Sequence, residues 1–449
     1  MKILQVSHGL PPKENAGVEL YTLHLSRALA QLGHEIHVFC RDADIRREEF
    51  SISEDQIDGL RVTRAVNNLK SLPHVRAYYD NPFFDQAFSK FLKEEKPDVV
   101  HFQHIFGLSA NLIRIAKKMG FPVVLTLHDF FLLCHRIHLM KEDHRLCPGP
   151  LYGLECASCL GCSLHPHDLR TKFILGMKDR LPFSVIKWTK RFFIPTQYLE
   201  DRGYEVFHRY RYIFEILKNP DLLLAPSRFV AAMYLKYYPS VRPRMRVLPL
   251  GVPPIQESGL HPGPNKSPDG KVRFCYFGNV LPLKGLHILV EAFKGLPQGR
   301  ATLTIYGSRA PWNESYYDRL RQEASGLSVG FRGPFQRENL SEAIKDQDVV
   351  VLPSICYETF SFVTREANFL GYPVIASRIG AIPEAIEEGE NGFLFAPGDS
   401  EDLKKQMLRF IEKPDLAQTM AVKRKKVKFM DDQASELIEI YQRLTERNR

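Results

Sequence analysis

The amino-acid sequence predicts an α/β protein built from two doubly wound domains. The chain has 449 residues, whereas a single hydrophobic core stops growing at about 250–300 residues. Both halves alternate short apolar runs with helical patterns, which indicates parallel sheets covered by helices. A stretch rich in Pro, Gly and Ser, VPPIQESGLHPGPNKSPDG, separates the halves as a linker would. We therefore predict an N-terminal domain at 1–252, a linker at 253–270 and a C-terminal domain at 271–449.

The first half begins with a β-like run, KILQVS, followed by a helical pattern from Val18 to Leu32. A second helical pattern is LSANLIRIAKKMG. The remaining apolar runs have the length of buried strands. In chain order they are HEIHVFC, RVTRAV, PDVVHFQH, FPVVLTLHD and PDLLLAPS.

The second half repeats this alternation. Helices are predicted from Gly285, near Glu338 to Lys345, and around Glu366. The chain then ends in QASELIEIYQRLTERNR, whose apolar spacing predicts an amphipathic helix that could pack on either domain. The predicted strands are KVRFCYFG, ATLTIYG, LSVGFRG, DVVVLPS, PVIAS and NGFLFAP.

The composition is that of a globular protein, with 44% hydrophobic and 25% charged residues. No apolar run reaches the roughly 18 residues that span a bilayer, and MKILQVSHGL is too short for a signal-peptide core. We expect a cytoplasmic protein. The net charge of +9 suits nucleic acid, an anionic membrane or an anionic small substrate. Because the sequence has no zinc-finger, RNA-recognition or long basic motif, we expect no nucleic-acid partner.

Ligands of open α/β sheets bind beyond the carboxyl ends of the strands. In the first half, the Pro-rich loop after the first strand leads to Gly17, where helix N–H groups could face an anion. An ordinary tight turn is the simpler interpretation. His128 ends another strand and could hydrogen-bond a polar ligand, although a lone histidine is more often structural.

In the second half, Gly278 ends a strand and Lys284 opens a helix, where a lysine suits a phosphate. The stretch SICYETFSFVTREANFLGYPVIAS then places Glu358 in a loop after a buried strand and Glu366 about one turn into the next helix. Carboxylates at these positions could bind the hydroxyls of a sugar or ribose. The alternative is a capping carboxylate and a solvated helix residue.

These motifs, in this order, resemble those of the family-4 glycosyltransferases of the GT-B fold, in which two Rossmann-like domains face each other across a cleft. The resemblance covers most of the chain. It is carried by SHGLPPKENAGVELYTLHLSRALAQLGHEIHV, TLHD, DLLLAPSRFV, RVLPLGV, FGNVLPLKGLHILVEAF, FRGPF and VVVLPSICYETFSFVTREANFLGYPVIAS.

The resemblance implies a role for each matching residue. Glu366 would hold the ribose hydroxyls of a nucleotide, Lys284 would contact the diphosphate, and His128 would touch the transferred sugar. Glu358 would lie near the donor sugar. Gly17 would let the first loop approach the donor and acceptor. The remaining donor-binding positions implied are Gly278, Asn279, Thr359, Phe360, Ser361 and Phe362.

The sequence departs from the family pattern in three places. Asn279 stands where an arginine is usual, so one diphosphate cation is missing and a residue such as Arg309 could replace it. The usual Gly-rich loop after Glu358 is the bulkier Thr359 to Phe362, and the usual Gly-Gly of the first loop is Ala16-Gly17.

The implied chemistry is retaining transfer from a nucleotide sugar, UDP- or GDP-linked, to a hydroxyl of a glycan or lipid-linked acceptor in cell-surface polysaccharide assembly. The departing diphosphate would be stabilised by cations and N–H groups. No DxD-type motif accompanies the proposed site, so we expect no catalytic metal. The alternatives are a nucleotide-sugar 2-epimerase and a catalytically silent nucleotide-sugar-binding protein.

Eight cysteines are present, five of them close together. Their C-x2-C-x2-C spacing in a cytoplasmic protein suggests thiolate ligands, and we expect a structural zinc site. Iron–sulfur ligation, free thiols and disulfides stay open as alternatives. The predicted ligands are Cys147, Cys156, Cys159 and Cys162, with Cys134 as a substitute.

These cysteines begin an insertion at about 134–218, whose part from Leu169 to Lys218 is basic and aromatic. Such a segment could lie on an anionic membrane, which would suit peripheral association at the inner face of the cell membrane. It could equally pack on its own domain.

Overall fold

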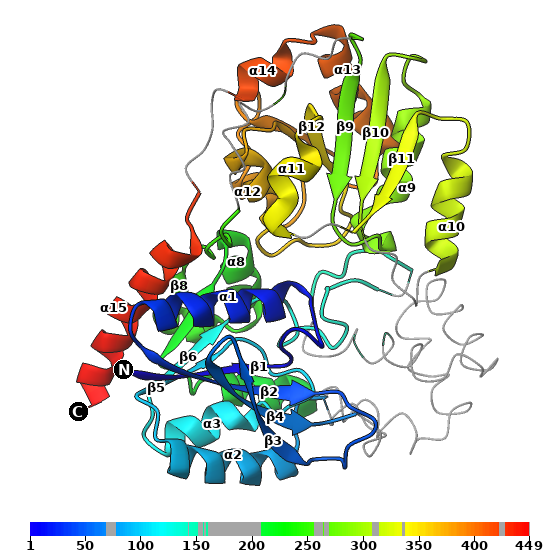
Figure 1. The fold of residues 1–449 in the computed structure, drawn as a ribbon. Helices are drawn as coiled ribbons and strands as arrows, with labels where there is room; N and C mark the ends of the chain where they lie inside the picture. The colour runs from blue at the N-terminus through cyan, green and yellow to red at the C-terminus, as the bar shows by residue number, and fades with distance from the viewer. Residues whose placement is uncertain are drawn as a thin grey trace, which may run out of the picture. The chain divides into compact units, whose positions relative to one another are not determined.

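The computed structural model describes residues 1–68, 78–141, 143–150, 156, 159, 208–255, 264, 269–307, 314–334, 337–421 and 427–448. The chain divides into two compact units (Figure 1). Unit 1 comprises Met1–Ala225, Ala231–Val247 and Ala434–Arg449, and unit 2 comprises Pro226–Val230 and Leu248–Gln433.

Unit 1 is built on an eight-stranded sheet in the order β3-β4-β2-β1-β5-β6-β7-β8. Its neighbouring strands are parallel except for the antiparallel pair β3 and β4. The bounds are β1 Lys2–Ser7, β2 Glu35–Asp42, β3 Ile52–Ile57, β4 Leu60–Val66, β5 Val99–Phe102, β6 Val123–Thr126, β7 Leu222–Ala225 and β8 Met245–Val247.

Helix α1 (Gly17–Gln31) covers one face of this sheet, and α2 (Pro82–Glu95) and α3 (Asn111–Lys118) cover the other (Figure 1). The Asn81 side chain accepts a hydrogen bond from the Phe83 N–H at 3.1 Å and caps α2. Two further elements follow β7, namely α8 (Arg228–Tyr237) and the 3₁₀ helix η3 (Pro239–Arg244).

Unit 2 contains a six-stranded parallel sheet in the order β11-β10-β9-β12-β13-β14. The strands are β9 Val272–Phe277, β10 Ala301–Tyr306, β11 Val329–Gly333, β12 Val349–Leu352, β13 Val374–Ser377 and β14 Gly392–Phe395. Every residue of β12, β13 and β14 is buried, as expected of parallel strands covered on both faces.

The helices of unit 2 alternate with these strands. They are α9 Leu286–Lys294, α10 Glu314–Glu323, α11 Leu340–Ile344, α12 Phe362–Phe369, α13 Ser400–Glu412 and α14 Leu416–Ala421, with 3₁₀ turns η4 Pro282–Lys284, η6 Arg337–Asn339 and η7 Ile382–Glu384. The Asp399 side chain caps α13 by accepting the Asp402 N–H at 2.9 Å.

The predicted fold class, two doubly wound α/β sheets, is confirmed. Several elements lie outside the sequence expectation, among them α8, β8, α10, β3 and α2. The sequence of β3, ISEDQI, is largely exposed and polar, so no apolar run indicates it. Helix α2 could have been found from Phe84, Phe88 and Leu92, which recur every four residues and are buried.

The final helix, α15 (Met430–Asn448), confirms the predicted C-terminal helix, and its residues from Ala434 belong to unit 1. The Tyr441 hydroxyl lies 2.5 Å from His101 Nδ1, and Arg246 Nη2 lies 2.5 Å from Glu436 Oε1. Near the two ends of the main stretch of unit 2, the chain lies side by side with itself: the Val252 N–H donates to Lys428 O at 2.9 Å. The other described residues of the predicted linker are 253–255, 264 and 269–270.

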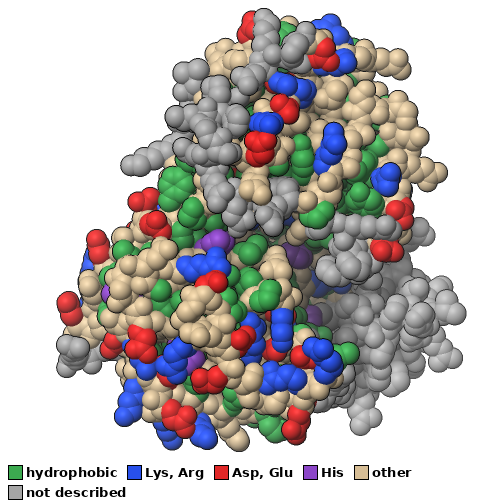
Figure 2. All heavy atoms as spheres, in the orientation of Figure 1, with side chains coloured by type: hydrophobic (Ala, Val, Ile, Leu, Met, Phe, Trp, Pro, Cys, Tyr) green, Lys and Arg blue, Asp and Glu red, His purple; other side chains and the backbone are tan. Residues whose placement is uncertain are grey.

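No helix within the described ranges is long and apolar enough to cross a membrane. On the face shown in Figure 2, Lys and Arg side chains are interspersed with Asp and Glu rather than gathered in one basic patch.

Candidate active site

Two of the predicted site residues meet at the carboxyl ends of neighbouring strands of unit 2. Lys284 closes the turn η4 after β9, and Glu358 lies in the loop after β12. Lys284 Nζ donates to Glu358 Oε1 at 2.7 Å, and the Ser354 hydroxyl donates to the same oxygen at 2.7 Å. The two strands are paired in the sheet, so residues 74 positions apart in sequence form one charged site.

Glycine makes this approach feasible. Gly285 adopts φ +70°, and a Cβ there would lie 1.9 Å from Pro353 O. Only glycine therefore lets the turn after Lys284 abut the end of β12. The Ile355 N–H also donates to Leu283 O at 3.0 Å, which fixes the Glu358 loop against the Lys284 turn.

The charges of this pair support each other. Burial is the largest single influence and lowers the pKa of Lys284, but Glu358, Cys356 and Tyr276 together raise it by more, so the pKa lies above its usual value. Lys284 is thus fully cationic at neutral pH. Its side chain is 28% exposed, so the ammonium group can still reach a ligand. A diphosphate is the kind of anion that would suit this cation.

Glu366 lies on α12, and its side chain is 2% exposed. Arg337, which begins η6 after β11, donates from Nε to Glu366 Oε1 at 2.6 Å and also contacts it through Nη2. Burial raises the pKa of Glu366, and Arg337 opposes that rise. Arg337 was not predicted, although its place just beyond a strand could have suggested it.

The loop between the two glutamates has a strained residue. Ser361 adopts φ +60°, a region that costs a residue with a Cβ about 1–2 kcal/mol. Thr364 Oγ1 donates to Ser361 O at 2.9 Å and holds this conformation. Phe360 and Phe362 pack edge-to-face at 5.1 Å, and Arg365 lies 3.6 Å from the Phe360 ring centroid. Thr359 is half-buried beside them.

Gly278 and Asn279 follow β9 at the same edge of the sheet. Gly278 adopts φ +146°. A Cβ on Gly307 would lie 2.1 Å from Gly278 O, so the chain after β10 passes close to this turn. The Tyr276 hydroxyl donates to Asn279 O at 2.7 Å. Arg309, suggested as a replacement cation, lies outside the described residues.

In unit 1, Gly17 is the first residue of α1, where Ala16 provides no side-chain cap. His128 follows β6 and is only 7% exposed. Its Nε2 lies 2.7 Å from Gln103 Oε1, while Gln103 Nε2 donates to Gln5 Oε1 at 2.8 Å. His128 Nε2 therefore carries the proton, which leaves Nδ1 as the acceptor. Its contact with a transferred sugar stays a prediction.

Acid is expected to destabilise unit 1, because two histidines are buried in the neutral form. Burial, and then the charge of neighbouring histidines, lowers the pKa of His101 and His128 to about 3. Unfolded histidine titrates near about 6.5, so below that pH the unfolded chain binds more protons and stability falls until about pH 3. Each group contributes about 1.4 kcal/mol per pH unit. Urea unfolding at pH 7 and at pH 5 measures the free energy of unfolding. Between these two pH values that free energy should fall less for His101→Gln than for the wild type; an equal fall would contradict the prediction.

The Glu358 loop depends on Gly380, whose φ is +61°. A Cβ there would lie 2.3 Å from Glu358 O and 2.6 Å from Glu358 N. We expect Gly380→Ala to move Glu358 and to lower the rate of the reaction at this site by about tenfold or more. Gly398→Ala is the matched control, because φ is +83° and no heavy atom of the described residues lies within 4 Å of the added Cβ. Equal rate losses in both variants would show that backbone strain alone is responsible.

The cysteine cluster does not form a metal centre among the described residues, where no group of three or more His, Cys, Asp or Glu side chains could hold an ion. Cys134, Cys147 and Cys156 are free thiols, and burial, then nearby thiols, raises the pKa of Cys156 to about 12. The predicted zinc site is therefore not supported. Its fourth ligand, Cys162, and most of the basic segment lie outside the described residues.

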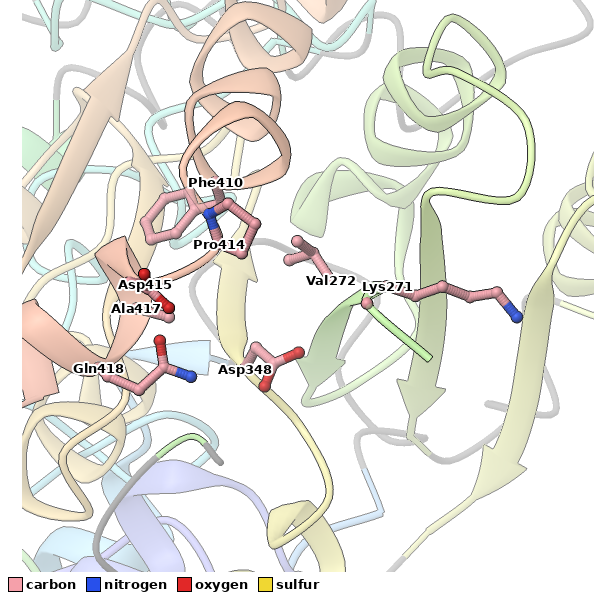
Figure 3. A pocket seen from close by; sticks show the side chains of 9 residues that line it. Lys271, Val272, Asp348, Phe410, Pro414, Asp415, Ala417 and Gln418 are labelled. Atoms are coloured by element: carbon pink, nitrogen blue, oxygen red, sulfur yellow. The ribbon is translucent and has the colours of Figure 1, made fainter. Parts of the chain in front are cut away.

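A separate hollow in unit 2 has a volume of about 290 Å³. It is lined by Val272 at the start of β9, Asp348 just before β12, and Phe410 of α13 (Figure 3). These are the amino ends of the strands, opposite to the edge that carries Lys284 and Glu358. The hollow therefore does not belong to the candidate active site.

Two family models match the chain. Residues 15–255 match Glycosyltransferase Family 4, and residues 260–427 match Glycosyl transferases group 1. The chain belongs to glycosyltransferase family 4. It is a nucleotide-sugar-dependent, retaining glycosyltransferase of the GT-B fold.

Curated relatives are similar over different lengths. Sulfoquinovosyl transferase SQD2 of Arabidopsis thaliana is 36% identical over 130 residues, which cover 28% of this chain and 24% of that protein. D-inositol 3-phosphate glycosyltransferase of Corynebacterium jeikeium is 28% identical over a match that covers 45% of this chain and 52% of that protein. Glycogen synthase of Mycobacterium tuberculosis is 23% identical over a match that covers 94% of this chain and 88% of that protein.

Solved structures share the fold over almost the whole chain. Sucrose-phosphate synthase from Thermosynechococcus elongatus has a TM-score of 0.66 at 19% identity, with 99% of both chains covered. Anabaena HepE, in complex with UDP-glucose, has a TM-score of 0.58 at 17% identity, with 100% of this chain and 99% of that one covered.

Proposed function

We propose that this enzyme transfers a sugar from a UDP-sugar, or failing that a GDP-sugar, to a hydroxyl of a glycan or lipid-linked acceptor in cell-surface polysaccharide assembly. The observation that carries the donor side is the Lys284–Glu358 pair, joined at 2.7 Å at the carboxyl ends of β9 and β12. The UDP-glucose complex of HepE, a protein of the same fold, supports UDP as the first nucleotide to test.

Each donor-site residue has a proposed role. Lys284 neutralises the diphosphate, and it stabilises the charge that develops there as the sugar departs. Glu366 accepts hydrogen bonds from the ribose diol. Its carboxylate would then bind the diol and Arg337 at the same time. Glu358 orients Lys284 and faces the donor sugar. The leaving phosphate accepts the proton of the acceptor hydroxyl on the same face, so no dedicated basic side chain is needed.

Arg337 is the leading candidate for the cation that Asn279 does not provide. Its guanidinium lies 5.3 Å from the Phe362 ring centroid and contacts Glu366, both of them residues that the family resemblance assigns to the donor. Its side chain is 31% exposed. A guanidinium placed there could pair with a phosphate oxygen while it keeps its contact with Glu366.

The test is incubation of the purified protein with UDP-, GDP- and ADP-sugars. Release of free nucleotide, slow without acceptor and faster with one, is expected for the true donor. Conversion of the sugar to its 2-epimer would support the epimerase instead. Binding without turnover of any donor would support a silent binding protein.

We further propose that the enzyme is cytoplasmic and associates with the anionic inner face of the cell membrane. The support is the basic, aromatic composition of residues 169–218. Of these, 208–218 are described. Sedimentation with vesicles rich in anionic lipid, compared with neutral vesicles, tests this proposal.

A further inference from the structure

A second group of titratable side chains lies in unit 1, at the carboxyl edge of its sheet. His8 follows β1, His104 follows β5 and Asp129 follows β6, while Glu19 occupies the first turn of α1. Four separate elements thus bring these side chains to one place. None of the four has a role in the donor site described above.

The four side chains form two histidine–carboxylate pairs. His8 Nε2 lies 3.0 Å from Glu19 Oε1, and His104 Nε2 lies 2.9 Å from Asp129 Oδ2. The two imidazole centroids are 4.2 Å apart, so the pairs adjoin each other. A carboxylate on Nε2 fixes the proton of a neutral imidazole there, which leaves Nδ1 as an acceptor. For His104 this agrees with Nδ1 accepting the Phe106 N–H at 3.2 Å.

The first pair has unused hydrogen-bonding capacity. His8 Nδ1 and Glu19 Oε2 are buried and have no hydrogen-bond partner among the residues that the structure describes. Glu19 is 4% exposed, whereas the His8 side chain is 18% exposed and opens the pair to solvent. Buried acceptors without a donor are costly, so they point to a ligand that supplies O–H groups.

The charge of the group is unsuitable for an anionic ligand. Two carboxylates, Glu19 and Asp129, lie within it. Two described cations nearby are already paired: Arg41 Nη1 of β2 lies 3.1 Å from Glu14 Oε1, and Lys13 Nζ of the loop after β1 lies 2.7 Å from Asp42 Oδ2.

An aromatic side chain borders the group. The ring of Phe106, which is half-buried, lies edge-on to His8 at 6.4 Å. Phe131 and Tyr78 support it at centroid distances of 5.5 Å and 5.2 Å. An aromatic wall with a few polar groups is the usual lining of a site for a small ligand, and it suits the C–H face of a sugar ring.

The group also adjoins His128. The charges of His104, Asp129, His8 and Glu19 all act on the pKa of His128. The family resemblance places His128 beside the transferred sugar, and the hydroxyl that receives this sugar must lie next to it.

We propose that His8 and Glu19, held by His104 and Asp129 as positioning residues, bind the acceptor, and that the group they bind is a neutral polyhydroxyl ring, a sugar or cyclitol without phosphate or carboxylate. This inference rests on the proposed glycosyltransferase function and specifies its acceptor. The ring would donate hydroxyl protons to His8 Nδ1 and Glu19 Oε2.

The test compares Glu19→Gln, which keeps the shape of the side chain, with Glu95→Gln. Glu95 forms the same kind of pair, at 2.9 Å from His37 Nδ1, but beside the amino ends of the strands. Saturation-transfer NMR with glucose and myo-inositol, and with their monophosphates, measures binding directly. Nucleotide release from UDP-glucose and GDP-mannose, with and without each compound, measures turnover.

We expect the neutral compounds to bind the wild type and the Glu95→Gln variant, and the monophosphates to bind neither. Glu19→Gln should weaken neutral-ring binding, and any stimulation of nucleotide release by these rings, by about ten- to hundredfold. UDP affinity and acceptor-free donor hydrolysis should change less than about twofold. His8→Ala should act in the same direction, and the thermal midpoint of each variant reports whether it is folded.

Preferential binding of the phosphorylated compounds, or neutral-ring binding that Glu19→Gln leaves unchanged, would overturn the proposal. If Glu19→Gln lowers UDP affinity as much as it lowers ring binding, the proposal would also be overturned. The His8–Glu19 pair would then be needed for donor binding or for folding rather than for acceptor binding. If the wild type turns over no nucleotide sugar, the glycosyltransferase proposal fails, whereas the NMR comparison still decides whether this group binds neutral rings.

Discussion

Lys284→Ala is expected to lower kcat for sugar transfer by about 10²- to 10³-fold, the usual effect of removing one group that stabilises developing charge. Lys284 and Glu358 are joined at 2.7 Å, so the substitution removes the cation and leaves a carboxylate beside the diphosphate. Like charges would then oppose donor departure as well as binding. Steady-state nucleotide release and UDP affinity measure the two effects separately.

The matched control is Lys294→Ala on the adjoining helix α9. Lys294 pairs with Glu291 at 3.0 Å, but both side chains are exposed at the surface, where such a pair contributes little. Lys284→Arg keeps the charge and should recover part of the rate. A Lys284→Ala enzyme with kcat within threefold of the wild type would remove Lys284 from the catalytic site.

Glu366→Ala is expected to weaken UDP binding by about 10- to 100-fold, since hydrogen bonds to a charged group contribute about 1.5–3 kcal/mol. The carboxylate is 2% exposed, so water cannot readily take the place of a ribose diol. Inorganic pyrophosphate, which has no diol, should bind equally well before and after the substitution. Calorimetric titration with both ligands distinguishes loss of the ribose contact from general damage to the site.

Two further variants sharpen this experiment. Glu388→Ala removes an exposed glutamate that pairs with Arg378 at 3.1 Å and should leave UDP affinity unchanged. Arg337→Ala removes the partner of Glu366, and burial would then raise the pKa of that carboxyl further. If Arg337 also contacts phosphate, this variant should lose pyrophosphate affinity, which Glu366→Ala should not. Unchanged UDP affinity in Glu366→Ala would refute the ribose assignment.

Much of the fold could be predicted because burial leaves a local pattern. The runs KILQVS and DVVVLPS contain the strands β1 and β12, and the spacing from Val18 to Leu32 corresponds to α1. Strand β3 could not be found this way, since its exposed face has no apolar run to detect.

The sequence predicted which residues belong to the candidate site, but not which of their side chains are in contact. The rule that ligands bind beyond strand ends singled out Lys284 and Glu358. It did not indicate that they share a hydrogen bond, nor that Arg337 contacts Glu366 or that His8 and Glu19 keep unused acceptors. Those facts depend on which strands are neighbours, and on rotamers that the surrounding residues select.

By itself the sequence determined the two α/β domains, the helix that ends the chain, and the residues placed just beyond each strand, because periodic burial and strand-end position are local properties of the chain. The tertiary structure decided the pairing of Lys284 with Glu358, the enclosure of Glu366 by Arg337, and the attachment of α15 to unit 1 through Tyr441 and His101. The physical reason is that β9 lies beside β12, although more than 70 residues separate them, so crossover connections rather than sequence neighbours bring these charges together.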